Sequence, residues 1–121
     1  MDRLVNEKSQ GLNMEGFWTA EFGSSSGIFG GGAVVFREGK IVGGDSTYYY
    51  TGEYSVSGNT FKATLKISPF IEGAESVFKT VGRDLTLDIE GSLTPDGRLI
   101  AQGRPREMPG LNFGAKLTKR G

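Results

Sequence analysis

Apolar and polar residues alternate along most of this chain, in short runs that are separated by turn-forming residues. The clearest run alternates Phe61, Ala63, Leu65 and Ile67 with Lys62, Thr64 and Lys66. A period of two is typical of a β-strand with one buried face, and a slip of one residue would bury two lysines. The pattern therefore predicts strands whose inward and outward faces are strongly specified.

Similar runs recur from residue 16 to residue 117 and predict about eight strands. They cover residues 16–22, 31–37, 40–42, 48–56, 61–67, 85–90, 98–103 and 111–117. Glu38-Gly39 is typical of a tight hairpin turn, and Pro95-Asp96-Gly97 is a strong turn signal. Consecutive antiparallel strands usually form a meander, and an eight-stranded meander closes readily into a barrel without exposed edges. We therefore predict an all-β fold, an antiparallel meander β-barrel.

The size of the inward-facing residues determines whether the barrel interior is filled by side chains or leaves a cavity. A barrel of about eight strands either fills with side chains or holds one small ligand. Filling is favoured by the large predicted inward residues Phe36, Tyr50, Phe61, Leu87 and Phe113. The 20 glycines among 121 residues exceed the usual share of about 7%, and those on the same faces leave room for a modest cavity.

One segment breaks the two-residue period. Five apolar residues there follow helical spacing: Phe70, Ala74, Val77, Phe78 and Val81. This spacing predicts one short α-helix over residues 72–80, with Gly82 as its C-cap.

The chain contains no cysteine and no histidine. Disulfides, thiolate metal sites, ordinary zinc sites and Ser-His-Asp or Cys-His nucleophiles are thereby excluded. Histidine is also the usual general base. We therefore expect a non-enzymatic protein with no cofactor.

Charge and hydropathy indicate a soluble, cytoplasmic protein. Fourteen basic residues balance fourteen acidic ones, so no net charge draws the chain to nucleic acid or to an anionic membrane. No apolar run approaches the ~20 residues that span a bilayer, and residues 1–14 lack the apolar core of a secretory signal. We expect residues 1–13 to be a disordered tail or extension, and residues 14–121 to form a single domain.

Three weaker patterns have simpler explanations than a site. The glycines at positions 27, 30, 31 and 32 lead into a strand and not into the helix that a phosphate-binding loop requires, so bulges or a close backbone approach explain them better. Asp88 and Glu90 alternate with apolar residues, which directs them to solvent, and Asp84 lies just before that run. A modest basic excess lacks stacking aromatics, and we expect no direct contact with nucleic acid; it comprises Arg98, Arg104, Arg106, Lys116, Lys119 and Arg120.

Four tyrosines form the unusual cluster of the sequence. Tyr48, Tyr50 and Tyr54 share one face of the predicted strand, and Tyr49 faces the opposite way. Two interpretations stay open, packing with satisfied hydroxyls or an aromatic interface or pocket rim, and the second would include Asp45.

The stretch Gly43-Gly44-Asp45-Ser46-Thr47-Tyr48-Tyr49-Tyr50-Thr51-Gly52-Glu53-Tyr54 resembles the GrlR-like family of bacterial type III secretion negative regulators. The opening Glu15-Gly16-Phe17-Trp18-Thr19-Ala20-Glu21-Phe22 and the glycine-rich Gly30-Gly31-Gly32-Ala33-Val34-Val35 are similar as well. The resemblance implies a lipocalin-like barrel with a short helix, commonly dimeric, that sequesters a transcription activator by protein–protein contact. This chain has no run of acidic residues that would attract a DNA-binding activator, so no binding residues are carried over.

Two functions follow as hypotheses. The leading one is a non-enzymatic regulatory protein that binds a transcriptional regulator and itself as a homodimer. The alternative is a carrier that holds a small apolar ligand in the barrel interior.

Overall fold

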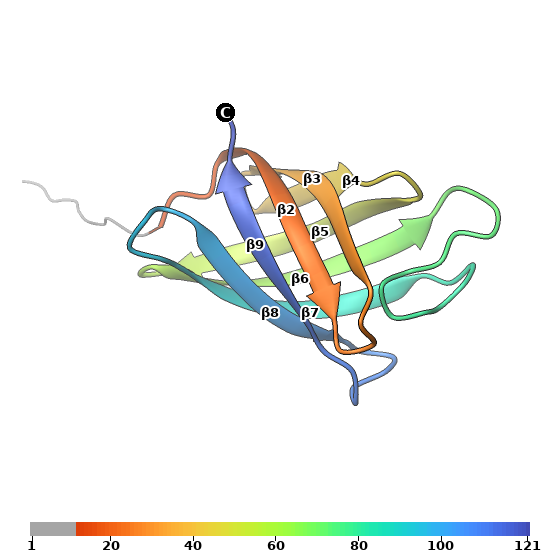
Figure 1. Ribbon diagram of the computed structural model, residues 1–121. Helices are drawn as coiled ribbons and strands as arrows, with labels where there is room; N and C mark the ends of the chain where they lie inside the picture. The colour runs from red at the N-terminus through yellow and green to blue at the C-terminus, as the bar shows by residue number, and fades with distance from the viewer. Residues whose placement is uncertain (1–11) are drawn as a thin grey trace, which may run out of the picture.

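Eight antiparallel strands form one closed barrel in the part of the chain that the computed structural model describes, residues 12–121 (Figure 1). The strands are β2 Gly16–Ser24, β3 Phe29–Arg37, β4 Lys40–Gly44, β5 Tyr48–Ser57, β6 Thr60–Pro69, β7 Leu85–Leu93, β8 Leu99–Pro105 and β9 Phe113–Lys119. Each strand pairs with the next in sequence, and β9 pairs with β2. The predicted meander barrel is confirmed. The prediction for residues 1–13 falls on residues outside the described part, except for Leu12 and Asn13.

The strand pairs keep one register along their whole length, so the ladders contain no bulges. Following the paired residues once around the barrel leads back to β2 at a point ten residues further along the chain. With a rise of about 3.3 Å per residue and a strand spacing of about 4.8 Å, this offset tilts the strands by about 40° from the barrel axis. An eight-stranded barrel with this tilt has an interior just wide enough for side chains or one small ligand.

The barrel interior is the hydrophobic core. All five large residues predicted to point inward are buried, namely Phe36, Tyr50, Phe61, Leu87 and Phe113. Aromatic rings pack edge-on around Phe36, whose centroid lies 5.1 Å from that of Tyr54, 6.3 Å from that of Trp18 and 6.4 Å from that of Phe61. The two-residue alternation thus determined which side chains form the core.

The predicted α-helix over residues 72–80 is wrong, because residues 70–84 form an irregular loop between β6 and β7. The backbone is left-handed at Gly73 and Lys79, and each such residue interrupts a helix. Gly82 is left-handed as well, but it caps no helix. The side chain of Ser76 accepts hydrogen bonds from the backbone N–H groups of Phe78 and Thr80, so turns take the place of helical bonds.

The helical spacing of apolar residues in this loop has a different origin. Ala74 and Phe78 are buried, whereas Phe70 and Val81 lie exposed. The ring of Phe78 packs edge-on against Phe113 of β9, with 5.9 Å between the centroids. The loop therefore presses Ala74 and Phe78 onto the end of the barrel, with Val77 partly buried beside them, whereas Phe70 and Val81 remain outside.

The two ends of the barrel differ. Tight connections join the strands at one end, including the predicted Glu38-Gly39 turn, where both residues have positive φ. The chain segment before β2 closes this end: Met14 is only 2% exposed, and its carbonyl accepts a 2.9 Å hydrogen bond from the indole of Trp18. At the other end lie the connections 25–28, 45–47, 70–84 and 106–112, and the last two are the longest between strands (Figure 1). We call these the closed end and the open end.

Candidate functional site

A cavity of about 290 Å³ occupies the interior of the barrel. Its wall is predominantly apolar and includes Val34, Phe61, Leu65, Leu87 and Phe113 from four different strands. Residues of three open-end connections also line it, around Ile28, Thr47 and Val77. The cavity therefore reaches from the core toward the open end.

Small residues at inward positions leave this space. Ala20, Ala63, Ala101 and Ala115 line the cavity from four strands. On β3, a side chain at Gly32 would meet the Tyr50 hydroxyl at 2.8 Å and the Gly44 carbonyl at 3.0 Å. The close backbone approach predicted from the glycine run is thus confirmed at Gly32. The absence of a side chain there makes room for the ring of Tyr50, and not for a phosphate.

Asp45 marks the mouth of the cavity. Its Oδ1 accepts hydrogen bonds from the backbone N–H groups of Thr47 (2.9 Å) and Tyr48 (2.8 Å), which orders the connection between β4 and β5. Its Oδ2 accepts a hydrogen bond from the Tyr50 hydroxyl. The carboxylate is therefore held in place by three donors from the adjoining turn and strand.

Tyr50 and Tyr48 are buried beside this carboxylate, and both hydroxyls are satisfied. Burial raises the pKa of Tyr50 far above its ordinary value, and the hydrogen bond to Asp45 raises it further. The Tyr48 hydroxyl lies 3.3 Å from the carbonyl of Ala74 and 3.4 Å from that of Thr80, to which it donates. Burial also raises the pKa of Tyr48. Tyr48 thereby fastens the 70–84 loop across the open end.

The other two tyrosines of the predicted cluster lie elsewhere. Tyr54 points inward near the closed end, where its hydroxyl donates to Glu15 at 3.1 Å; burial and this bond raise its pKa. Tyr49 lies on the outer face and is 49% exposed. The structure thus brings Tyr48, Tyr50 and Asp45 together at the cavity mouth, and it separates Tyr49 and Tyr54 from them.

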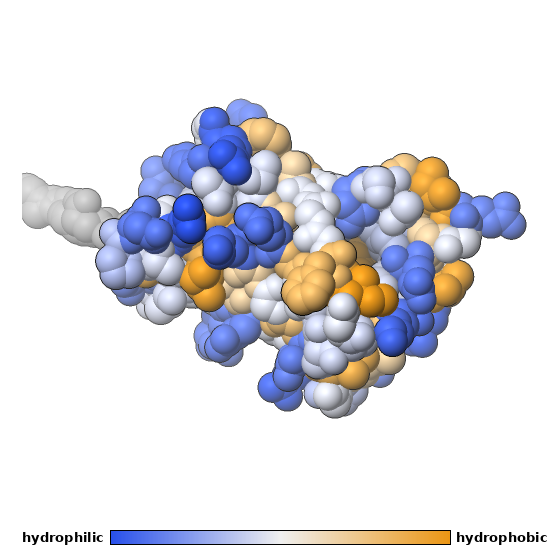
Figure 2. All heavy atoms as spheres, viewed as in Figure 1, coloured by the Kyte–Doolittle hydropathy of each residue, from blue (hydrophilic) through white to orange (hydrophobic). Residues whose placement is uncertain are grey.

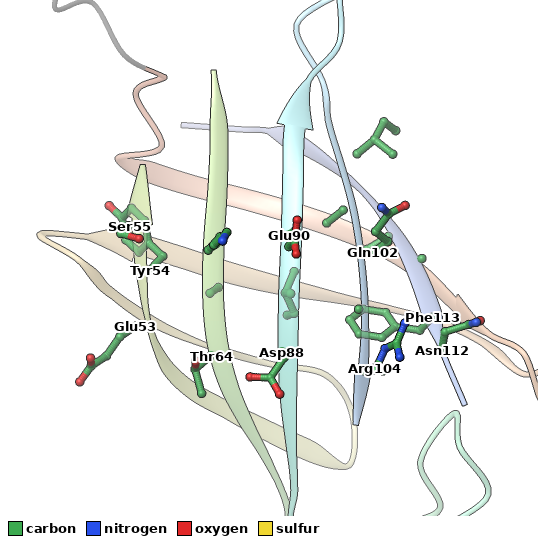
Figure 3. A pocket seen from close by; sticks show the side chains of 18 residues that line it. Glu53, Tyr54, Ser55, Thr64, Asp88, Glu90, Gln102, Arg104, Asn112 and Phe113 are labelled. Atoms are coloured by element: carbon green, nitrogen blue, oxygen red, sulfur yellow. The ribbon is translucent and has the colours of Figure 1, made fainter. Parts of the chain in front are cut away.

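A second, wider hollow lies on the outside of the barrel, over strands β5 to β9 (Figure 3). Its volume is about 1060 Å³, and it opens broadly to solvent. Glu53, Thr64, Asp88 and Arg104 lie opposite one another in register across four neighbouring strands. Mixed charges in an open depression enclose little of a ligand, so the smaller interior cavity is the better candidate.

The remaining charged candidates lie on the surface, as the alternation predicted. Asp88 forms a bidentate pair with Arg106, at 2.6 and 3.0 Å, and Asp84 pairs with Lys66 at 3.3 Å. The hydrogen bonds from Arg106 lower the pKa of Asp88. Within residues 12–121, no group of three or more acidic side chains is placed to hold a metal ion.

Sequence reasoning missed Glu75, which lines the cavity from the 70–84 loop. The predicted helix gave this residue no role, and the loop conformation that turns it toward the mouth has no short-range sequence signal. The glycines on the inward faces indicated that a cavity was possible, but they did not indicate its size or lining.

The rim of the open end carries exposed apolar side chains. Phe29 is 81% exposed, and Phe70, Ile71 and Val81 of the 70–84 loop are also exposed. Figure 2 shows hydrophobic surface over the loop that follows β6, next to hydrophilic surface. The entrance to the cavity is therefore bordered by apolar groups.

Comparison with protein-family models found no match, and comparison with curated proteins found none either. In the described part of the chain, no helix has the length and apolar character needed to cross a membrane.

Proposed function

We propose that this protein binds a small, largely apolar molecule inside the barrel, and that it acts by binding and not by catalysis. The observation that carries the proposal is the 290 Å³ cavity with its apolar wall. Ligand pockets are about 300–1,000 Å³, so this cavity lies at the small end of the range. At about 30 Å³ per non-hydrogen atom, it accommodates a molecule of about ten such atoms.

The two barrel ends support a single direction of entry. Met14 and Trp18 seal the closed end. The open end is covered only by connections, of which the 70–84 loop is irregular and carries Phe78 into the barrel. A ligand would enter there, past the apolar rim, and displace little more than loop contacts.

Calorimetric titration with octan-1-ol tests the proposal, because this alcohol is neutral and fits the cavity in size. A ligand of this size binds with a Kd on the order of 100 μM when it is well enclosed. Ala63→Leu fills the cavity from β6 and is expected to weaken binding at least tenfold. Thr64→Leu places the same leucine side chain at the next residue, on the outer face, and is the control. No binding to the wild-type protein, or equal binding to Ala63→Leu, would contradict the proposal.

A second candidate function is binding to another protein, and the outer face of β2 to β5 favours it. Phe17, Val35 and Val42 lie opposite one another in register across β2, β3 and β4, and Tyr49 lies nearby on β5. Phe17 is 44% exposed and Val42 is 53% exposed. The outer face of β6 to β8 carries lysines, acids and an arginine at the corresponding positions. An apolar patch on one side of a barrel is typical of an interaction surface.

A second copy of this chain is the partner that this outer face fits best. A two-fold interface places each patch against itself, and an uncharged apolar centre meets its own copy without repulsion. The resemblance to GrlR-like regulators is consistent with such a cytoplasmic dimer, and in that case a transcriptional regulator would be the further partner. Sedimentation equilibrium of Val42→Lys, with Thr64→Lys as control, tests this: a dimer that only Val42→Lys dissociates supports it, and a monomeric wild type contradicts it.

A further inference from the structure

We infer that the cavity selects ligands by charge: an apolar amine binds best, and an apolar carboxylic acid is rejected. This inference rests on the proposed ligand-binding function and names the chemical class of the ligand. It is carried by the polar groups that meet at the mouth of an otherwise apolar cavity.

The first observation is the sign of the charges around the cavity. Asp45 and Glu75 both line it, and among residues 12–121 no lysine or arginine does so. Asp45 comes from the connection between β4 and β5, and Glu75 from the 70–84 loop. The two carboxylates therefore approach the mouth from separate segments, and no basic side chain lines the cavity with them.

The second observation is the fixed position of Asp45. Three donors hold its carboxylate: the N–H groups of Thr47 and Tyr48 and the hydroxyl of Tyr50. A carboxylate has about four acceptor sites, so one remains for a donor from a ligand. Because the three bonds prevent the side chain from turning away, the negative charge stays at the mouth when a ligand enters.

The third observation concerns the tyrosine hydroxyls, which would otherwise donate to an acidic ligand. The Tyr50 hydroxyl donates its hydrogen bond to Asp45, and the Tyr48 hydroxyl donates to the carbonyls of the 70–84 loop. Both hydroxyls also have raised pKa values, so they keep these protons at neutral pH. Near Asp45, these phenols can therefore accept a hydrogen bond from a ligand, but they have no free O–H group to donate to one.

These three features oppose an anionic head group and favour a cationic one. Two unit charges about 5 Å apart, at an effective dielectric constant of about 20, change an affinity by roughly 250-fold. Glu75 is exposed, so solvent screens the contribution of its charge to the difference in affinity. We expect a primary amine to bind at least tenfold more tightly than the carboxylic acid of equal chain length, with the alcohol between them.

The test is a set of three calorimetric titrations at pH 7, with octylamine, octan-1-ol and octanoate. The expected order of affinity is amine, alcohol, carboxylate. Glu75→Gln and Asp45→Asn are each expected to reduce the ratio between amine and carboxylate, whereas Glu90→Gln, which removes an outward carboxylate of β7, leaves it unchanged. Glu75 is exposed, so its substitution tests the inference even where Asp45→Asn unfolds the turn.

The outcomes separate the inference from the function on which it rests. Octanoate that binds as tightly as octylamine, while octan-1-ol also binds, overturns the charge selection and leaves the ligand-binding function standing. A preference for the amine that Glu75→Gln and Asp45→Asn both leave intact overturns it as well. Failure of all three molecules to bind overturns the proposed function, and the inference with it.

Discussion

The hydroxyl of Tyr50 on β5 donates a hydrogen bond to the carboxylate of Asp45, five residues earlier in the connection that precedes this strand. The bond joins a wall of the barrel to its mouth. It also explains Gly32, because any side chain there would collide with the Tyr50 hydroxyl. One phenol thus connects the glycine-rich strand β3, the turn before β5 and the polar edge of the cavity.

The buried phenol of Tyr50 makes the fold sensitive to high pH. Burial and the bond to Asp45 raise its pKa in the folded protein, whereas in the unfolded chain a tyrosine ionises near pH ~10. Its contribution to stability is therefore complete below about pH 10 and is lost as the pH rises toward the folded pKa. We expect the urea midpoint to fall between pH 9 and pH 11, and to fall less in Tyr50→Phe. Tyr49→Phe, on the outer face, is the control; an identical pH dependence in Tyr50→Phe would contradict the explanation.

The ion pair between Asp88 and Arg106 acts at the opposite end of the pH range. The hydrogen bonds from Arg106 lower the pKa of Asp88 in the folded protein. The resulting stabilisation is present above the unfolded pKa of about 4 and is lost as the pH falls through the lower folded value. We expect Asp88→Asn to lose less stability than the wild type between pH 5 and pH 3, measured by urea unfolding. The effect is small because the pair is exposed. Glu90→Gln on the same strand should follow the wild type.

Glycine at position 52 is required by the close approach of two strands. A side-chain carbon there would lie 2.2 Å from the carbonyl oxygen of Thr64 and 3.0 Å from the Cα of Leu65. Gly52→Ala must push β5 away from β6, and we expect it to lower the free energy of unfolding by about 1–3 kcal/mol.

Gly114→Ala is the matched control for this substitution. The nearest atom to a side-chain carbon at position 114 is the Ala101 carbonyl oxygen, 3.8 Å away. Alanine fits there and restricts the unfolded chain, so stability should stay level or rise by up to about 1 kcal/mol. Equal losses in the two variants, measured by urea unfolding, would show that contact with β6 is not the reason for Gly52.

The barrel could be predicted from the sequence because each strand encodes its faces locally. Lys62, Thr64 and Lys66 permit only one register for β6, and Glu38-Gly39 permits little but a hairpin. These signals act over two to ten residues. They also predicted, without any knowledge of the partner strands, that Tyr49 lies on the other face of its strand from Tyr48 and Tyr50.

The 70–84 loop shows where such reasoning fails. Spacing alone cannot distinguish a helix from a loop that buries Ala74 and Phe78 against strands far away in sequence. The cavity is also beyond local patterns, because its volume depends on which alanines and aromatics face each other across the closed barrel. The sequence predicted that Asp45 and Tyr50 could belong to one cluster, but it could not predict the hydrogen bond between them.

Met14 seals the closed end of the barrel, and its loss should affect stability more than any surface change. It is almost completely buried, and its carbonyl holds the Trp18 indole. Met14→Ala leaves a void beneath the aromatic cluster, with an expected cost of about 2–4 kcal/mol in the free energy of unfolding. Met108→Ala makes the same substitution in the partly exposed connection before β9 and should cost less than about 1 kcal/mol. If urea unfolding gave equal losses for the two variants, the segment before β2 would not be a structural part of the barrel.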